Sequence, residues 1–233
     1  MTIPRQNVRP TFVFEFTDVF VVGATTYLRD YSGHDLHAAF PGAGANPTPQ
    51  TDGSLSFDGG DYLNLPLAFY LYGPTGEYTW VVLFAYNTSI TGTFFSTWNG
   101  GGGGTHYGNA FRLNTVGAYS TLALMGGGGA VLASNRADLA WAGQERNIVQ
   151  HSLETTCRAV RETAFLTTTW TAGAYFATVY DATVIPTIGV QVGPANWYTG
   201  RMYYLALLPY RATADDMLWI SGELREGRKP WCQ

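Results

Sequence analysis

Short strand-like segments, separated by turn-forming residues roughly every 8–15 positions, recur along the whole sequence. Residues 54–58 alternate apolar and polar side chains and stop at a Gly-Gly pair, as a half-buried strand does. Residues 78–86 (YTWVVLFAY) are almost continuously apolar, which is typical of a central strand covered on both faces. About a dozen such segments predict an all-β sandwich or barrel. They cover residues 12–16, 19–22, 54–58, 62–65, 78–86, 93–98, 110–114, 119–125, 147–153, 158–169, 174–180, 188–192 and 201–208.

One short helix is expected near the C-terminus, over residues 213–226. Thr213 can cap its first turn, where Asp215 and Asp216 complement the partial positive charge of a helix N-terminus. Gly227 then ends it, because glycine accepts the left-handed backbone that follows a helix.

The chain is expected to form one domain with an N-terminal extension. Pro4 and Pro10 disfavour regular structure in residues 1–11, which we predict to be an extended arm. No shift in composition and no internal repeat divides residues 12–233, so we predict a single domain there.

Charge is scarce: charged residues make up 13% of the sequence, about half of the usual share of roughly 25%. The net charge of −4 argues against a nucleic-acid partner, which normally needs a basic face. No apolar run reaches the roughly 18–20 residues that span a membrane, so membrane insertion is not expected. Glu15 and Asp18 interrupt any signal-peptide core, so we expect synthesis in a cytoplasm without general secretion.

The two cysteines, Cys157 and Cys232, lie far apart in the sequence and show no metal-binding spacing. Two buried thiols are the default interpretation. The alternative is a disulfide that ties the C-terminal tail to the domain, if the protein matures in oxidising surroundings.

Four segments, taken in order, resemble the concanavalin A-like lectin/glucanase family, specifically its laminin-G-like branch. Residues 53–66 (GSLSFDGGDYLNLP) match best, since the family has Phe-Asp-Gly followed by an apolar strand that ends in Pro. The other segments are 28–42 (LRDYSGHDLHAAFPG), 78–100 (YTWVVLFAYNTSITGTFFSTWNG) and 198–224 (YTGRMYYLALLPYRATADDMLWISGEL). The resemblance as a whole spans residues 28–226. The family's Tyr-Val-Asn-Gly hairpin is absent, and residues 163–170 (TAFLTTTW) stand in its place.

The resemblance implies an antiparallel two-sheet jelly-roll sandwich. Many relatives bind calcium, and four carboxylates could supply its hard oxygen ligands. These are Asp30, Asp35, Asp58 and Asp61. No other cofactor is expected.

Glucanases of this architecture use two carboxylates roughly 5–10 Å apart. The nearest pairs in this sequence are Asp58 with Asp61, Asp215 with Asp216, Glu154 with Glu162, and Glu223 with Glu226. A turn, a helix end or the nearby Arg158 and Arg161 accounts for each pair, so we expect no enzymatic activity.

A glycan site would use exposed loop aromatics beside polar side chains, because ring faces stack on the apolar faces of sugars. The stretch that flanks the first Gly-rich loop is the most lectin-like. The candidates are Trp98, Asn99, His106, Tyr107, Trp197 and Tyr198. The alternative is that these rings pack the edge of the sandwich.

These observations lead us to expect a non-enzymatic virion protein of a bacteriophage, in a capsid decoration, head fibre or tail fibre. The fold type is usually extracellular, yet no export signal is found, and particle proteins leave the cell by lysis. The arm would contact other virion subunits in a homo-oligomer, and the sandwich would bind a host-surface glycan, stabilise the particle, or both. The alternative is a free-standing cellular lectin or glycan hydrolase of the same fold.

Overall fold

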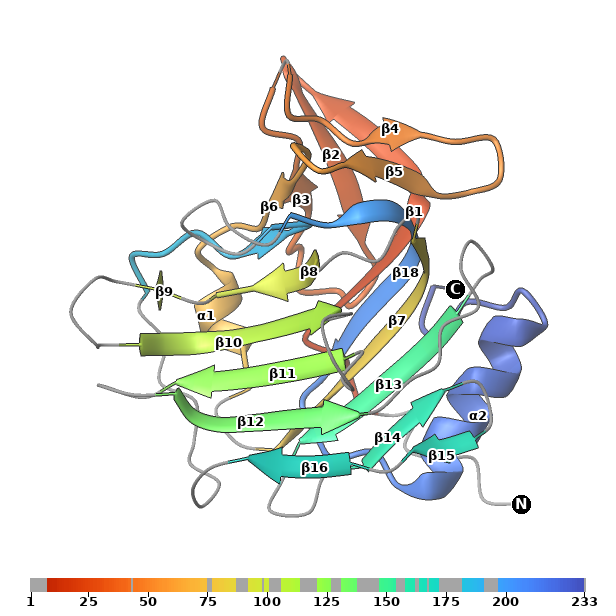
Figure 1. The fold of residues 1–233 in the computed structure, drawn as a ribbon. Helices are drawn as coiled ribbons and strands as arrows, with labels where there is room; N and C mark the ends of the chain where they lie inside the picture. Colours follow the sequence, from red (N-terminus) through yellow and green to blue (C-terminus); the bar gives the residue numbers. More distant parts are fainter. Residues whose placement is uncertain are drawn as a thin grey trace.

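Antiparallel strands pair throughout the protein and stack as a sandwich of two sheets, as the computed structural model shows (Figure 1). This confirms the all-β sandwich predicted from the spacing of the strand-like segments. The structure describes residues 8–42, 44–74, 77–86, 92–97, 99–100, 106–113, 121–126, 131–137, 147–153, 158–161, 164–166, 168–171, 182–190 and 197–232.

The first sheet is centred on the antiparallel pair β7–β18. β18 pairs along its second half with β1 and along its first half with β5, on the edge away from β7. In spatial order the first sheet contains β15 (Ala164–Leu166), β14 (Arg158–Arg161), β13 (Asn147–Leu153), β7 (Tyr78–Tyr86), β18 (Thr199–Leu208) and β1 (Phe12–Val22), with β5 (Leu55–Asp58) and β4 (Thr48–Pro49) continuing beside the start of β18.

The second sheet lies across the core from the first, and the β1–β2 hairpin joins the two. It contains β16 (Thr168–Thr171), β12 (Val131–Ala137), β11 (Thr121–Gly126), β10 (His106–Leu113), β8 (Gly92–Ser96), β17 (Thr187–Ile188), β6 (Leu63–Asn64), β3 (Ala38–Ala39) and β2 (Thr25–Asp30), and β9 (Asn99–Gly100) pairs with the start of β10.

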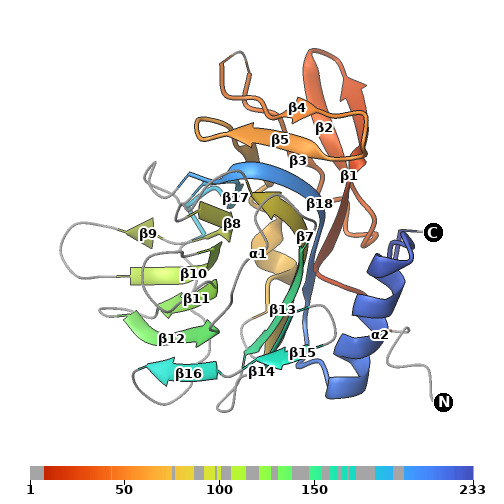
Figure 2. The same ribbon diagram turned by 45° about the vertical axis from the view of Figure 1, so that its right-hand side comes forward.

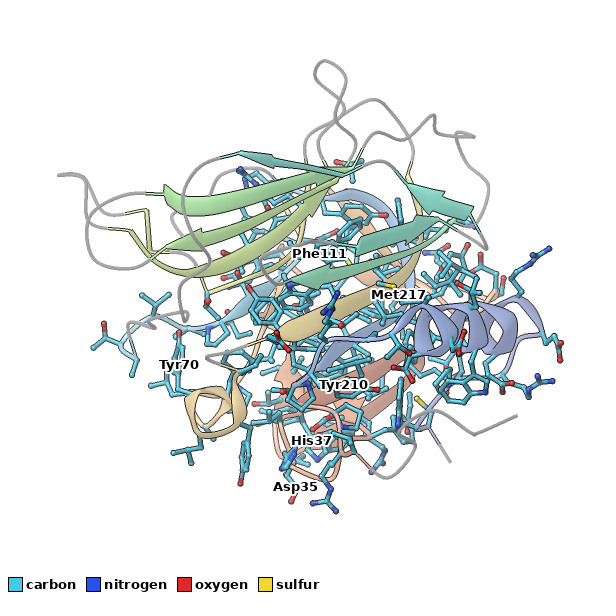
Figure 3. All side chains as sticks on the ribbon, turned by 90° about the horizontal axis from the view of Figure 1, so that it is seen from below. Asp35, His37, Tyr70, Phe111, Tyr210 and Met217 are labelled. Carbon is cyan, nitrogen blue, oxygen red and sulfur yellow. The ribbon has the colours of Figure 1, made fainter. Side chains whose placement is uncertain are left out.

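β7 is buried on both faces, as its apolar sequence predicts. Trp80 and Phe84 point into the core between the sheets, whereas Val81 and Leu83 point to the opposite face. The Trp80 ring is stacked on Phe111 of the second sheet, with centroids 5.5 Å apart and planes inclined by 7°. Figure 3 shows Phe111 in the middle of the molecule. This contact is one of several aromatic contacts that join the two sheets across the core.

Helix α2 (Ala214–Arg225) covers the outer face of the first sheet, and α1 (Phe69–Tyr72) is a single turn (Figure 2). The bounds of α2 agree with the helix predicted over residues 213–226. The Thr213 hydroxyl accepts a hydrogen bond from the Asp216 amide at 3.1 Å, and the Thr213 amide donates to the Asp216 carboxylate at 2.8 Å. Gly227 follows with φ of +77°. Neither helix among the described residues has the length and apolar character needed to cross a membrane.

Both ends of the described chain pack on the sandwich. Pro10 and Thr11, from the predicted arm, are buried, and the Thr11 amide donates to the carbonyl of Leu207 at 2.8 Å. Residues 1–7 lie outside the described residues. Near the C-terminus, Cys232 carries an unbonded thiol that packs against the core under α2, and burial raises its pKa to about 12. Cys157, the other predicted thiol and the partner in the alternative disulfide, lies outside the described residues.

The capping box should contribute measurably to stability. We expect Thr213→Ala to lower the free energy of unfolding by about 1 kcal/mol, because it removes the acceptor for the Asp216 amide. Urea denaturation followed by far-UV circular dichroism measures this change. Thr213→Ser keeps the hydroxyl and should retain most of the stability. Equal stability of the Ala variant and the parent would contradict this role.

Candidate functional site

The six residues predicted to bind a glycan do not form one site. Tyr198 lies in the core between the sheets, where it is 1% exposed. Its ring packs on Phe57 and Phe94, and its hydroxyl donates to the Ala85 carbonyl at 2.7 Å. Burial raises the pKa of this hydroxyl well above its usual value, so it remains a donor. The expectation that Tyr198 contacts a ligand is therefore corrected: it is a core residue.

The most lectin-like stretch forms a hairpin. Asn99 of β9 lies opposite Tyr107 of β10, and Gly100 lies opposite His106. The fold thus brings the two sides of the Gly-rich loop together, as a shared site would require. Trp98 lies outside the described residues, and the other positions of this hairpin are described by their backbone.

Trp197 lies at the opposite end of β8 from this hairpin. A Cβ on Gly92, the first residue of β8, would come within 2.9 Å of the Tyr198 backbone and 3.3 Å of the Trp197 carbonyl. The hairpin begins after Ser96, the last residue of β8. A five-residue strand rises about 3.3 Å per residue, which separates the two groups by more than about 10 Å. Trp197 therefore belongs to a different surface.

That surface pairs Trp197 with Tyr62. Both rings are partly buried and meet edge to face, with centroids 6.0 Å apart and planes inclined by 60°. Because side chains alternate along extended backbone, Thr199 lies on the same face as Trp197, and Asp58 lies opposite Thr199 across the β5–β18 pair. We call these four residues, Asp58, Tyr62, Trp197 and Thr199, the Trp197 ledge.

A tight turn between β5 and β6 brings Tyr62 to the ledge. Gly59 has φ of +99°, a left-handed conformation that glycine adopts without steric cost. A Cβ there would also lie 3.1 Å from the Thr199 hydroxyl oxygen. The Asp58 carboxylate accepts from the Gly60 amide at 2.8 Å. The turn conformation therefore favours glycine, and the Thr199 side chain leaves little room for a Cβ there.

Asp61 closes the turn from the inside. Its carboxylate accepts from the Asp58 amide at 2.9 Å, and the residue is 7% exposed. Burial raises the pKa of Asp61, and the negative charge of Asp58 raises it further. Asp58 is exposed and presents the accessible carboxylate of the ledge.

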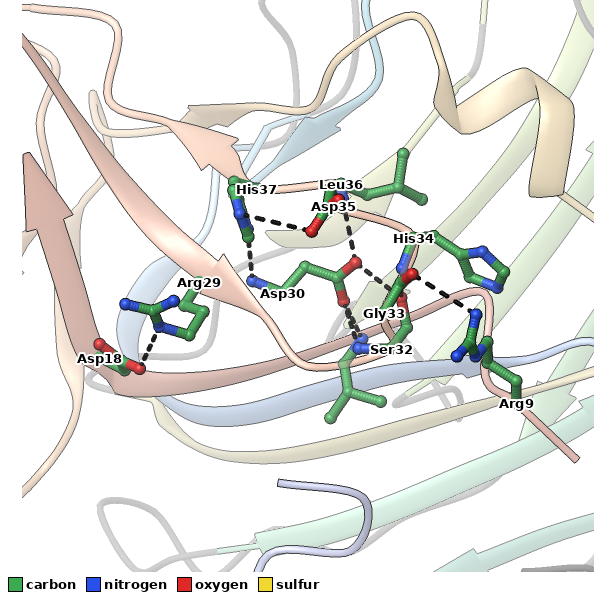
Figure 4. A network of polar contacts seen from close by, with 11 residues as sticks. Arg9, Asp18, Arg29, Asp30, Ser32, Gly33, His34, Asp35, Leu36 and His37 are labelled. Atoms are coloured by element: carbon green, nitrogen blue, oxygen red, sulfur yellow. Dashed lines mark hydrogen bonds and ion pairs between the residues drawn. The ribbon is translucent and has the colours of Figure 1, made fainter. Parts of the chain in front are cut away.

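Asp30, a predicted calcium ligand, organises a loop instead. Its buried carboxylate accepts from the amides of Val13, Ser32 and Leu36 at 2.9–3.0 Å and from the Ser32 hydroxyl at 2.6 Å (Figure 4). Both carboxylate oxygens are thus engaged, one by an amide of β1 and an amide of the loop, and the other by two donors of the loop. The Asp30 side chain thus joins the loop of residues 30–37 to β1.

The other predicted calcium ligands are arranged as follows. Asp35 is exposed, with a carboxylate oxygen 3.9 Å from His37 Nε2. Asp58 and Asp61 belong to the turn beside the ledge. Among the residues that the structure describes, no three His, Cys, Asp or Glu side chains gather as a metal site requires. Asp30, Asp58 and Asp61 make hydrogen bonds in the loop and the turn, whereas Asp35 is exposed.

The predicted carboxylate pairs also serve structural contacts where they are described. Asp216 belongs to the helix cap. Glu223 and Glu226 both pair with Arg228, which binds Glu223 at 2.6 Å. Glu154 and Glu162 lie outside the described residues. Arg228 lowers the pKa of Glu223, as expected for an ion pair.

Tyr62 is absent from the candidates drawn from the sequence. The signal was nevertheless present, because Leu63 and Leu65 are apolar and their burial places Tyr62 and Asn64 on the opposite face. What the sequence does not show is that Trp197 meets Tyr62, since this contact depends on the β5–β18 pairing.

No protein-family model matches the sequence, and neither does any curated protein. Solved structures do share the fold. A sialidase of Trypanosoma rangeli matches with a TM-score of 0.58 and 14% identity over 92% of this chain, which spans 32% of the sialidase. The binding domain of botulinum neurotoxin serotype D matches with a TM-score of 0.62 and 5% identity, covering 94% of this chain and 52% of that domain structure.

A third match is the CBM40 of the Ruminococcus gnavus IT-sialidase, bound to α2,3-sialyllactose. Its TM-score is 0.56 at 11% identity, and it covers 72% of this chain and 96% of the CBM40. At such identities the likeness concerns the fold alone. It supports the lectin-like β-sandwich implied by the sequence resemblance, without bearing on a bacteriophage source.

Asp30 should be the most sensitive polar position in the described part of the chain. Asp30→Asn replaces one acceptor oxygen with a donating NH2 group, which cannot accept from the amides that face it. We expect the free energy of unfolding to fall by about 2 kcal/mol. Urea denaturation measures this, with Asp35→Asn as the matched control, because Asp35 is exposed. A loss no larger than that of the control would contradict the organising role of Asp30.

His34 should make stability depend on pH. Its ring stacks on Tyr72 with centroids 4.0 Å apart, and burial and then Arg9 lower its pKa. The unfolded chain therefore binds a proton more readily, so stability should decline as the pH falls from 7 to 5. His34→Gln should make this decline smaller, as measured by urea denaturation at each pH. An unchanged decline would show that other groups cause it.

Proposed function

We propose that the protein is a non-enzymatic glycan-binding module that holds a saccharide on the Trp197 ledge. The observation that carries this proposal is the partly exposed Trp197–Tyr62 pair, set beside the exposed carboxylate of Asp58. Aromatic faces with a few polar groups are the usual means by which proteins hold sugars in a fixed orientation.

The ledge offers both kinds of contact that a sugar needs. The edge-to-face contact with Tyr62 fixes the angle of the indole, so the apolar face of a pyranose ring can pack on it. The Asp58 carboxylate can accept hydrogen bonds from hydroxyl groups, and the Thr199 hydroxyl can donate or accept. The fold likeness to a CBM40 bound to sialyllactose supports a sugar-binding role for a sandwich of this shape.

The absence of catalysis is part of the proposal. Its support is that the described carboxylate pairs make turn, cap and arginine contacts, with Asp61 buried beneath Asp58. A glycosidase would need two carboxylates facing one substrate across several ångströms.

We propose that the protein is displayed on a bacteriophage particle as a homo-oligomer. The alternative is a free-standing lectin or glycan hydrolase. The low charge content supports a surface that packs against other subunits. So do the exposed apolar side chains at the tip of the β1–β2 hairpin and on α1, where Val21 is 66% and Leu71 79% exposed. A stable monomer in light scattering that does not co-sediment with virions would contradict this setting.

The ledge is tested by glycan binding. The parent protein is screened on a glycan array, and its best ligand is titrated by calorimetry. We expect Trp197→Ala to weaken binding at least about tenfold, which corresponds to about 1.4 kcal/mol, and Asp58→Asn to weaken it as well. Leu71→Ala, which removes an exposed apolar side chain from α1, away from the ledge, should bind as the parent does.

Circular dichroism and thermal unfolding verify that each variant is folded. Unchanged affinity of Trp197→Ala would reject the ledge. An array without binding above background would reject glycan binding altogether.

A further inference from the structure

The outer face of the β1–β2 hairpin carries an aromatic pair that neither core uses. Leu28 lies in the core between the sheets and its cross-strand partner Val19 packs against that core. The next pair, Phe20 and Tyr27, therefore faces outward. Their rings stack with centroids 5.6 Å apart and planes inclined by 24°, and both remain partly exposed.

Two further side chains hold the Phe20 ring in place. The edge of His37 meets it at a centroid distance of 4.9 Å and an interplanar angle of 83°. The guanidinium carbon of Arg29 lies 4.7 Å from the ring centroid, a cation–π contact. Figure 3 shows His37 at the edge of the molecule, away from Phe111 in the core. The aromatic surface is thus rigid and lies at the periphery.

The polar groups around the rings have unused hydrogen-bonding capacity. One oxygen of Asp18 accepts from Arg29 Nε at 2.7 Å and from the Tyr31 hydroxyl at 2.5 Å. Within the described part of the chain, no hydrogen bond engages the other oxygen of Asp18 or the two terminal nitrogens of Arg29. Burial and the contact with Asp18 raise the pKa of Tyr31, which therefore stays a donor to Asp18.

His37 adds a donor of defined direction. Its Nδ1 accepts from the backbone amide of Asp30 at 3.0 Å, as Figure 4 shows. In the neutral ring, Nε2 must then carry the hydrogen. The nearest carboxylate oxygen, on the exposed Asp35, is 3.9 Å from Nε2, which is too long for a hydrogen bond. The Asp30 loop therefore positions a donor beside the rings.

We propose that this surface, formed by Asp18, Phe20, Tyr27, Arg29 and His37, is a second binding site, for a neutral saccharide with adjacent hydroxyl groups. Each hydroxyl of such a ligand can donate to Asp18 and accept from Arg29 or His37, while the apolar face of the sugar packs on the aromatic pair. An acidic sugar is disfavoured, because the carboxylates of Asp18 and Asp35 carry two negative charges against the single positive charge of Arg29.

The site is tested with the full chain and its variants by saturation-transfer NMR and calorimetry. The probes are the methyl glycosides of glucose, galactose and mannose, with galacturonic acid as the acidic comparison. All measurements are made in the Trp197→Ala variant, which lacks ledge binding, so that any remaining saccharide binding comes from the hairpin surface. We expect a neutral glycoside to bind in this background more tightly than galacturonic acid.

Phe20→Leu keeps apolar volume but loses the ring, and we expect it to weaken this binding at least about tenfold. Arg29→Lys keeps the charge but loses the planar fork, and it should weaken binding as well. Leu71→Ala is the matched control on α1. The thermal unfolding of every variant shows whether it is folded. If the Phe20→Leu variant does not fold, Arg29→Lys still tests the site.

The outcomes separate this site from the ledge. If Trp197→Ala alone abolishes all saccharide binding, the second site is rejected and the ledge stands. If binding survives Trp197→Ala and is lost with Phe20→Leu, the second site stands whatever happens to the ledge. Tighter binding of galacturonic acid than of the neutral glycosides would overturn the proposed ligand class.

Discussion

The pairing of β7 with β18 is the contact on which the rest of the molecule depends. Both strands contribute to the core between the sheets and to the core under α2, so their side chains alternate between two apolar surroundings. Several other features are attached to this pair. β18 receives β1 and β5 on its free edge, and α2 covers its outer face. A shift of one residue would exchange the two faces and disrupt both cores.

The same register places the ledge. Tyr198 enters the core directly before β18, and the preceding residue must then point outward. The β5–β18 pairing sets Asp58 opposite Thr199, so the turn that follows β5 delivers Tyr62 to the indole. A surface feature is thus a consequence of core packing, with the close approach at Gly59 allowing β18 to lie against the turn.

Local patterns predicted the fold well, but they did not show which aromatic and carboxylate side chains are buried. The apolar run of β7 and the cap of α2 are visible in the sequence because each depends on neighbours in the chain. Whether Trp197 or Tyr198 is buried depends on which side of the backbone before β18 faces the core between the sheets. Adjacent residues in the sequence do not reveal this. The Asp30 carboxylate is of the chemical type that binds metal ions, yet it accepts hydrogen bonds from amides of β1 and the loop. Long-range pairing supplies what the sequence leaves undetermined.

The two aromatic surfaces share a physical property that matters for binding. Each exposed ring is held by a second ring at a steep angle, Trp197 by Tyr62 and Phe20 by His37. A ring fixed in this way loses little conformational freedom when a ligand packs on it, so more of the contact energy remains as affinity. The scarcity of long charged side chains has the same effect, since lysines near a ring would have to be ordered or displaced. A rigid aromatic surface with few flexible charges is therefore suited to weak, uncharged ligands such as sugars, for which small entropic losses decide whether binding occurs.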